Sequence, residues 1–324
     1  MPEKILEVKN LQTHFFTKSG VVKAVDGVSF HVNKGETLGL VGESACGKTI
    51  TCLSILRLVP QPAGKIVGGE VILDGVDILE MTNRQMQEVR GDQISMILQD
   101  PMTSLNPVFT VGTQVAWPIR QHQKNIGKKD IWEKVKDMLH RVKIPSPEVR
   151  LNEFPHQMSG GMRQRIIGAM SLSCQPKLLI ADEPTTALDV TVQAQFLDLI
   201  KSIQREDDLA MIMVTHDFGI VANVCDRVAV MYAGKIVETA PIRELFNDPR
   251  HPYTMALMAS LPKMEEDLET LYSIEGQPPN LSNLPPGCSF LPRCEHAMDI
   301  CKEKYPANSE VRDGHTVSCW LMEK

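Results

Sequence analysis

The fold of this chain is constrained most by one segment near the N-terminus, Gly42-Glu43-Ser44-Ala45-Cys46-Gly47-Lys48-Thr49. The segment fits the pattern G-x-x-x-x-G-K-[ST], which is typical of a phosphate-binding loop. The apolar run 37–41 before it predicts a buried strand, and residues 50–58 after it predict the start of a helix. Strand, loop and helix in this order are the context that the motif requires. We therefore predict an α/β fold organised around a nucleotide; an incidental glycine turn is the alternative.

The residue types of this loop are suited to bind a polyphosphate. Its glycines let the backbone approach phosphate oxygens closely, so that N–H groups of the loop and of the helix N-terminus face the negative charge. Lys48 is expected to reach the β- and γ-phosphates, and the Thr49 hydroxyl is expected to ligate Mg²⁺. The predicted nucleotide-binding residues are Gly42, Glu43, Ser44, Ala45, Cys46, Gly47, Lys48, Thr49 and Ile50.

Two adjacent carboxylates, Asp182 and Glu183, follow the apolar run 177–181. The run predicts a strand, and open α/β sheets bind ligands at the carboxyl ends of their strands. Asp182 is therefore a predicted Mg²⁺ ligand, and Glu183 is a candidate general base that polarises an attacking water. A solvated Asp-Glu pair at a strand end is the alternative.

Other patterns along the chain predict the surrounding elements. Apolar runs at 94–98 and 210–214 alternate with helical patterns, which is typical of a parallel sheet buried on both faces. Alternation at 5–11 predicts a strand with one solvated face, and residues 132–142 have helical spacing. Beyond residue 248 prolines are frequent, so we expect a mostly irregular C-terminal segment.

The composition excludes some classes of protein. Among 324 residues, no apolar stretch approaches the roughly 18 residues of a membrane-spanning helix. The first residues lack the apolar core of a signal peptide, so we expect a cytoplasmic chain that reaches a membrane only through partners. The net charge of −6 argues against a broad nucleic-acid surface.

A second candidate anion site lies in the run Ser159-Gly160-Gly161-Met162-Arg163-Gln164-Arg165. A serine and two glycines at a helix N-terminus favour a bound anion. The run resembles the LSGGQ signature of ATP-binding cassette (ABC) ATPases, with methionine at 158 and 162 where leucine and glutamine are usual. The resemblance implies that Ser159, Gly160, Gly161 and Met162 contact the γ-phosphate held by a second subunit. An ordinary Ser N-cap followed by flexible glycines is the alternative.

The other motifs of ABC ATPases follow in the family's order. Gln99 resembles the Q-loop glutamine, and Thr186-Ala187-Leu188-Asp189 resembles the D-loop that passes between two sites. His216 resembles the switch histidine at the γ-phosphate; a capping or core histidine is the alternative. Phe15 is similar to the aromatic residue that stacks on adenine, with Phe16 as second choice. The resemblance thus implies hydrolysis of ATP with Mg²⁺. The implied catalytic residues are Glu183, His216 and Gln99, and the implied Mg²⁺ ligands are Thr49, Gln99 and Asp182.

One position of the phosphate-binding loop departs from the family. Ala45 stands where glycine is usual. Its methyl group disfavours a positive φ and narrows the approach of phosphate. We expect the loop to tolerate alanine, with nucleotide affinity as the property that it affects.

The C-terminal segment carries a second resemblance. Three runs are similar to the C-terminal extension of oligopeptide, dipeptide and nickel importer ATPases: residues 250–254, 275–279 and 287–294. We therefore predict a nucleotide-binding domain at 1–248, with a helical subdomain at about 100–174, and an extension at 249–324.

Half of the eight cysteines fall within the last 37 residues: Cys288, Cys294, Cys301 and Cys319. In a reducing compartment such clustering favours a metal or iron–sulfur site over disulfides. Their spacing fits neither ferredoxins nor zinc ribbons and leaves the metal open. The resemblance implies a [4Fe-4S] cluster that closes the proline-rich tail. Zinc, with His296 or His315, and free thiols are the alternatives.

Together the resemblances imply an ATP-hydrolysing subunit that powers the import of dipeptides or oligopeptides across the cytoplasmic membrane. The implied partners are a homologous but different ATPase subunit, two transmembrane permease subunits and, indirectly, an extracytoplasmic substrate-binding protein; a homodimer in isolation is the alternative. We expect a peripheral position on the cytoplasmic face of the membrane and no nucleic-acid partner. A nickel importer and a soluble ABC ATPase are the alternative functions.

Overall fold

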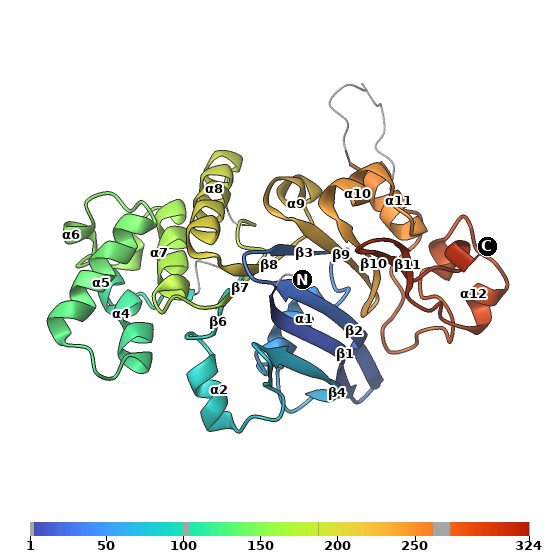
Figure 1. Ribbon diagram of the computed structural model, residues 1–324, viewed down its shortest axis with the longest axis horizontal. Coiled ribbons are helices and arrows are strands. Elements are labelled where there is room, and N and C mark those ends of the chain that lie inside the picture. Colours follow the sequence, from blue (N-terminus) through green and yellow to red (C-terminus); the bar gives the residue numbers. More distant parts are fainter. Residues whose placement is uncertain (1–2, 100–103, 187, 262–272, 324) are drawn as a thin grey trace. The chain divides into compact units, whose positions relative to one another are not determined.

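The computed structural model describes residues 3–99, 104–186, 188–261 and 273–323 (Figure 1). Two predicted features lie partly outside these residues: Ala187 of the D-loop, and residues 100–103 at the start of the helical subdomain. Short stretches of both predicted domains also lie outside them. The chain forms two compact units, each of which is described by itself. The first comprises Met1–Leu6, Val32–Glu36 and Leu73–Met213, and the second comprises Glu7–His31, Thr37–Ile72 and Val214–Lys324.

The first unit contains parallel strands and a group of helices. β6 (Ile94–Ile97) and β7 (Leu178–Asp182) are parallel, and β7 also neighbours β8 (Ala210–Thr215), which continues into the second unit. The strands predicted at 94–98, 177–181 and 210–214 are therefore confirmed. The unit also contains β5 (Val76–Asp77), α2 (Asn83–Val89), α4 (Val111–His122), α5 (Lys128–Arg141), α6 (Pro147–Arg150), η1 (Pro155–Gln157), α7 (Gly160–Leu172) and α8 (Val190–Asp207).

Helices α4, α5 and α7 of the first unit pack against one another (Figure 1). In α5 the buried residues Ile131, Val135, Met138 and Leu139 recur at helical spacing and form one apolar face. The helix begins four residues before the predicted Trp132, because polar residues that carry no periodic signal form its first turn. Apolar periodicity marks the buried face of a helix and leaves its solvated first turn unmarked.

The second unit contains two sheets. In one of them the order is β2 (Gly20–Asn33), β1 (Lys4–Thr17) and β4 (Gly64–Leu73). In the other the order is β11 (Ser309–Arg312), β12 (His315–Val317), β10 (Lys235–Pro241), β9 (Arg227–Tyr232) and β3 (Thr37–Val41). In this second sheet β3 and β9 are parallel, and the pairs β11–β12, β12–β10 and β10–β9 are antiparallel. The helices are α1 (Lys48–Ile55), α9 (Phe218–Val224), α10 (Ile242–Asn247), α11 (Pro252–Ala259), η2 (Leu291–Arg293), α12 (Ile300–Glu303) and η3 (Trp320–Glu323).

The strand and helix predicted around the phosphate-binding loop are present. All five residues of β3 are buried, and its register pairs Leu38 with Arg227 and Val41 with Val230 of the parallel strand β9. α1 ends at Ile55, before the predicted residue 58. The reason is Arg57, whose φ of 53° is left-handed and cannot continue a right-handed helix.

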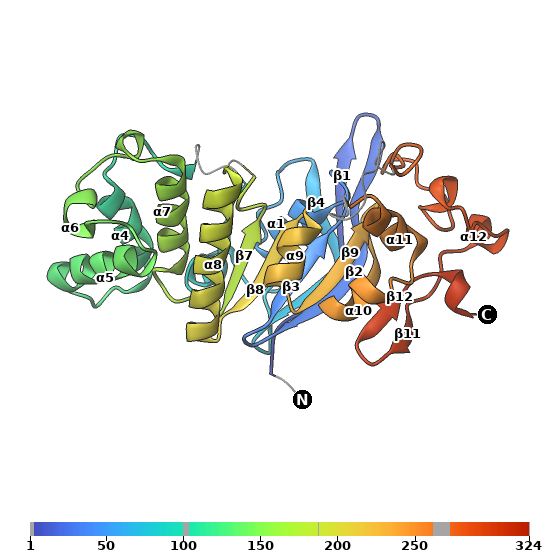
Figure 2. The same cartoon turned by 90° about the horizontal axis from the view of Figure 1, so that it is seen from above.

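The C-terminal segment contains more regular structure than its prolines suggested. Figure 2 shows the strands β11 and β12, which form a hairpin, and β12 pairs antiparallel with β10. Pro252 occupies the start of α11, where its missing N–H has no helical partner to lose, and His251 caps this helix. Among the described residues of this segment, the prolines therefore begin helices or lie in connections.

Candidate functional site

The backbone of the phosphate-binding loop requires its two outer glycines. Gly42 and Gly47 have φ values of 153° and 111°. A Cβ on Gly42 would lie 2.2 Å from the Met231 carbonyl oxygen, and one on Gly47 would lie 2.3 Å from that of Ala24. A side chain at either position would force the neighbouring backbone apart. The loop thus leads from β3 into α1 with its backbone closely packed.

Lys48 lies at the start of α1 with its ammonium group turned onto the loop. Its Nζ donates to the carbonyl oxygens of Gly42 at 2.7 Å and of Glu43 at 3.0 Å. The residue is only 5% exposed. The loop therefore encloses a positive charge, as expected of a site for a polyphosphate.

Ala45 adopts the left-handed conformation that its methyl group disfavours, with a φ of 62°. An L-residue in this region costs roughly 1–2 kcal/mol. We predict that Ala45→Gly raises the free energy of unfolding by about 1 kcal/mol, because glycine adopts this conformation without strain. Thermal unfolding measures the effect, and Ala240→Gly in β10 is the control that is expected to destabilise. An unchanged or lower melting temperature for Ala45→Gly would contradict the prediction.

In the first unit the predicted general base contacts the predicted Q-loop glutamine. β7 ends at Asp182, which is 1% exposed. The next residue, Glu183, accepts hydrogen bonds on Oε2 from Gln99 Nε2 at 2.9 Å and Thr186 Oγ1 at 3.2 Å. Glu183 has a φ of 45°, an uncommon conformation for a non-glycine residue that is often found at functional sites. The side chain is therefore oriented by two donors at a strained turn.

The signature segment begins helix α7, also in the first unit. Ser159 caps the helix, with its Oγ accepting from the Met162 N–H at 3.3 Å. A Cβ on Gly161 would lie 2.6 Å from Val192 Cγ1, so this glycine allows close packing against α8. Ser159 thus has the capping role of the alternative interpretation, which does not conflict with an anion site at the same N-terminus.

Buried Gln164 connects the signature helix to the turn that follows Glu183. Its Nε2 donates to the Pro184 carbonyl oxygen at 2.6 Å. Further along, Asp189 of the predicted D-loop caps α8 and accepts from the Val192 N–H at 3.0 Å. The carboxylate turn, the signature helix and the D-loop residue therefore belong to one hydrogen-bonded and packed region of the first unit.

His216 of the second unit follows β8 and is exposed. The capping role in α9 belongs to its neighbour Asp217, which accepts from the Gly219 N–H at 2.7 Å. His216 is therefore neither buried in the core nor the N-cap of α9. Its role at the γ-phosphate stays a prediction.

The two phenylalanines considered for adenine differ in exposure. Phe15 is half-buried, and a Cβ on Gly64 would lie 2.9 Å from its Cε1. Phe16 is 48% exposed, with Lys65 Nζ 5.6 Å from its ring centroid. The adenine contact of Phe15, with Phe16 as second choice, stays a prediction.

The prediction of an iron–sulfur cluster at the C-terminal cysteines is wrong. All four line one small cavity of about 10 Å³. Yet among the described residues no group of three or more His, Cys, Asp and Glu side chains could hold a metal ion. Burial raises the pKa of Cys288 to about 11 and raises those of Cys294 and Cys319, which favours thiols over the thiolates that ligate metals. The zinc alternative meets the same difficulty.

Packing and hydrogen bonds, rather than a cluster, order the tail. Phe290 and Val317 are buried. His315 Nε2 lies 2.8 Å from Oε1 of buried Glu238, which also accepts from the Arg250 N–H at 2.7 Å. The sequence argument failed because it assumed that a proline-rich tail has no core to bury. The core of this tail is provided by β10 and α11.

His251, at the start of α11, is expected to make the stability of the C-terminal segment depend on pH. Burial lowers the pKa of His251 to about 3, and its Nδ1 accepts from the Tyr253 N–H at 3.0 Å. The unfolded chain binds a proton at this histidine more readily than the folded chain does. The free energy of unfolding therefore decreases as the pH falls from about 6.5 toward 3. Between pH 7 and pH 5 we expect a loss of about 2 kcal/mol from this group. Denaturant unfolding of His251→Asn, which keeps a capping acceptor, should show a smaller loss, and an equal loss would contradict the prediction.

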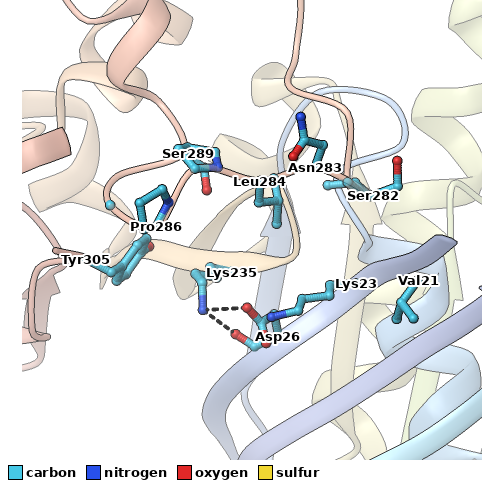
Figure 3. Close-up of a pocket in the computed structure, with 13 residues that line it drawn as sticks. Val21, Lys23, Asp26, Lys235, Ser282, Asn283, Leu284, Pro286, Ser289 and Tyr305 are labelled. Atoms are coloured by element: carbon cyan, nitrogen blue, oxygen red, sulfur yellow. Dashed lines mark hydrogen bonds and ion pairs between the residues drawn. The ribbon is translucent and has the colours of Figure 1, made fainter. Parts of the chain in front are cut away.

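A cavity of about 350 Å³ lies between the β1–β2 hairpin, β10 and the C-terminal segment (Figure 3). Its lining includes Lys23, Asp26, Lys235, Asn283 and Tyr305. Lys235 Nζ lies 3.0 Å from Asp26 Oδ2. Burial alone would raise the pKa of Asp26, but the hydrogen bond and charge of Lys235 lower it. The ion pair uses one of the two lysines in the lining, so the charged residues of the lining carry a net formal charge of +1.

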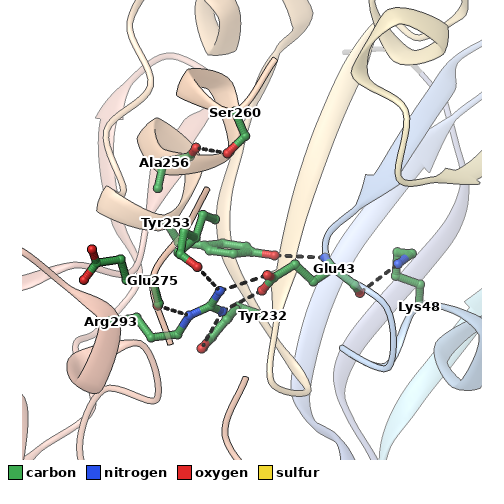
Figure 4. A network of polar contacts seen from close by, with 9 residues as sticks. Glu43, Lys48, Tyr232, Tyr253, Ala256, Ser260, Glu275 and Arg293 are labelled. Carbon is green, nitrogen blue, oxygen red and sulfur yellow. Dashed lines mark hydrogen bonds and ion pairs between the residues drawn. The ribbon is translucent and has the colours of Figure 1, made fainter. Parts of the chain in front are cut away.

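Two residues that contact the phosphate-binding loop escaped the sequence analysis. Tyr253 and Arg293 of the C-terminal segment both bond to Glu43 (Figure 4). They lie within runs that were noted only for their family resemblance. No local pattern predicts a contact across 250 positions of the chain.

Two family models match the chain. Residues 25–186 match the ABC transporter family, and residues 237–301 match the C-terminal region of oligopeptide/dipeptide transporters. Among the described residues, no helix has the length and apolar character needed to cross a membrane.

Curated relatives cover almost the whole chain. A probable peptide ABC transporter ATP-binding protein of Sinorhizobium fredii is 52% identical over 98% of this chain and 94% of the relative. The dipeptide transport ATP-binding protein DppD of Bacillus subtilis is 49% identical, over 99% of this chain and 96% of the relative. The oligopeptide transport ATP-binding protein OppD of the same organism is 51% identical, over 98% and 89%.

Solved structures show the same fold. A dimeric ATP-binding cassette in a post-hydrolysis state, bound to ADP and Pi, superposes with a TM-score of 0.65. It is 24% identical, and the match covers 74% of this chain and 99% of that chain. The predicted α/β fold of an ABC nucleotide-binding domain is thereby confirmed. This chain belongs to the ABC transporter family of ATP-binding proteins, in the group that carries the oligopeptide/dipeptide transporter C-terminal region.

Proposed function

We propose that this chain binds and hydrolyses ATP to power the import of dipeptides or oligopeptides. The observation that carries the proposal is Glu183, which directly follows buried Asp182 and is oriented by Gln99. This arrangement suits a general base, and it occurs in a chain about half identical to peptide-transport ATP-binding proteins.

The residues divide the chemistry among them. Lys48 and the loop N–H groups bind the phosphates, and Glu183 polarises the attacking water. Thr49, Asp182 and Gln99 are the proposed Mg²⁺ ligands, because each carries the hard oxygen donor that Mg²⁺ prefers. When bound, Mg²⁺ neutralises charge on the phosphates. His216 contacts the γ-phosphate and stabilises its negative charge while the phosphoryl group is transferred from ADP to water.

The second subunit completes the proposed site. Ser159, Gly160, Gly161 and Met162 contact the nucleotide held by the partner, and Asp189 lies near the boundary between the two sites. We propose a homologous but different ATPase as this partner. In functional terms, residues 1–248 form the nucleotide-binding domain and residues 249–324 the extension.

The proposed assembly places the chain at the cytoplasmic face of the membrane, bound to two permease subunits that receive cargo from a substrate-binding protein. Affinity purification of the chain from membranes tests this. We expect two polytopic membrane proteins to co-purify and peptide to stimulate the ATPase when the binding protein is added. A nickel-dependent stimulation, or a soluble partner only, would overturn the peptide-import assignment.

Phe16 is the proposed adenine contact, since its ring is the more exposed of the pair. Phe16→Ala should raise the Kd for ATP about fivefold or more, because stacking of a base on an aromatic ring contributes roughly 1–3 kcal/mol. Phe15→Ala should instead lower the melting temperature with little change in Kd. Isothermal titration with ATP checks both variants, and the reverse pattern would return the role to Phe15.

A further inference from the structure

The C-terminal segment holds one residue of the phosphate-binding loop through two side chains (Figure 4). Arg293 of η2 donates from Nη1 to Glu43 Oε2 at 2.7 Å and from Nη2 to Oε1 at 3.0 Å. The Glu43 backbone N–H donates to Tyr253 Oη of α11 at 2.9 Å. Glu43 directly follows Gly42, the first glycine of the loop. Both its side chain and its backbone are therefore fixed from the C-terminal segment.

Arg293 is held in place by other contacts besides Glu43. Its Nε donates to the Glu275 carbonyl oxygen at 3.1 Å, and its guanidinium lies 5.9 Å from the Tyr232 ring centroid. The side chain is 3% exposed. A planar guanidinium fixed in this way presents its fork to a carboxylate with little further loss of entropy. The bidentate pair is thus geometrically specific.

Tyr253 is equally rigid. Its ring is fully buried and lies 4.5 Å from the Tyr232 centroid and 5.3 Å from the Phe290 centroid. Burial raises the pKa of the Tyr253 hydroxyl well above its usual value, so the group is a neutral hydrogen-bonding partner. Among the hydrogen bonds described for Tyr253, one reaches the phosphate-binding loop: its hydroxyl oxygen accepts from the Glu43 N–H.

The charge of Glu43 gives these contacts a consequence for ligand binding. The carboxylate belongs to a loop whose proposed ligand carries several negative charges. An unpaired carboxylate there would repel the phosphates, and the repulsion would be larger for each additional phosphate charge. Arg293 neutralises Glu43, while Lys48 donates to the Glu43 carbonyl oxygen at 3.0 Å.

We propose that the C-terminal segment sets the nucleotide affinity of the phosphate-binding loop, with Arg293 neutralising Glu43 and Tyr253 holding its backbone. Arg293 and Tyr253 are positioning residues, since they act on the ligand through Glu43. The inference rests on the proposed function, in which this loop binds ATP. It assigns to the extension a role at the nucleotide in addition to any role in transport.

The test is titration of the full chain with ATP and with ADP, without Mg²⁺, at low salt. Arg293→Gln should raise the Kd for ATP about tenfold, which corresponds to 1.4 kcal/mol, and the Kd for ADP less. The double variant Glu43→Gln/Arg293→Gln should return the ATP affinity to within about threefold of wild type, because no unpaired charge remains. High salt should reduce the effect of Arg293→Gln. Arg312→Gln, at an exposed arginine of the same segment, is the control.

The outcomes separate a charge effect from loss of structure. Equal weakening of ATP and ADP, or no recovery in the double variant, would overturn the inference while leaving ATP binding by the wild type intact. Wild-type protein that fails to bind ATP would overturn the proposed function and the inference with it. If Arg293→Gln does not fold, Tyr253→Phe keeps the ring and removes only the hydroxyl. It should raise the Kd for ATP about threefold, and an unchanged Kd would contradict the role of Tyr253.

Discussion

Replacing Glu183 with glutamine is expected to lower kcat for ATP hydrolysis by about 10²- to 10⁴-fold, the usual contribution of a positioned general base. An amide cannot accept the proton of the attacking water. In the wild type Gln99 Nε2 donates to Glu183 Oε2 at 2.9 Å. The side-chain oxygen of the introduced glutamine can accept the same hydrogen bond, so the local structure should persist. The Kd for ATP should therefore change little. Phosphate release under saturating ATP measures kcat, and equilibrium titration measures Kd.

The same variant should accumulate in a nucleotide-bound dimer, because closure no longer leads to hydrolysis. Size-exclusion chromatography with and without ATP detects this state. Glu88→Gln, at an exposed carboxylate of the first unit, is the matched control and should keep wild-type turnover. Unchanged turnover in Glu183→Gln would remove Glu183 from the role of general base.

Replacing Lys48 with alanine is expected to raise the Kd for ATP about 100-fold, equivalent to roughly 2.8 kcal/mol. The ammonium group is the buried positive charge of the phosphate-binding loop, where its attraction to phosphate is screened less than at the surface. Its present partners are the carbonyl oxygens of Gly42 and Glu43. Titration of the variant with ATP checks the loss.

Thermal unfolding of Lys48→Ala without nucleotide separates two explanations. Since Lys48 bonds to its own loop, the variant could weaken binding by loosening the loop. A melting temperature close to that of wild type, together with lost ATP affinity, would identify a direct contact with phosphate. Lys9→Ala, which removes an exposed lysine of β1, should leave the affinity within about twofold of wild type. Wild-type affinity in Lys48→Ala would contradict the assignment.

Much of the fold could be predicted because the motifs are local. Gly42 and Gly47 lie at a fixed spacing, and only glycine fits the φ values and close approaches that the loop requires. An unbroken apolar run such as 37–41 has to be buried on both faces, which favours a central strand. These requirements depend on neighbouring residues, and a single sequence displays them directly.

The cysteines show where local reasoning stops. Clustering along the chain does not fix the arrangement of side chains in space, and a metal site depends on that arrangement. The tail also gained burial from β10 and α11, which a count of its prolines could not reveal. The predicted cluster failed for this reason.

The phosphate-binding loop and its flanking strand and helix could be predicted from the sequence alone, because they follow from short-range backbone and burial requirements. Which side chains contact one another is known only from the tertiary structure. Gln99 meets Glu183 across 84 positions, and Arg293 meets Glu43 across 250. Such pairs depend on how whole elements pack, and nothing in either short segment encodes its distant partner.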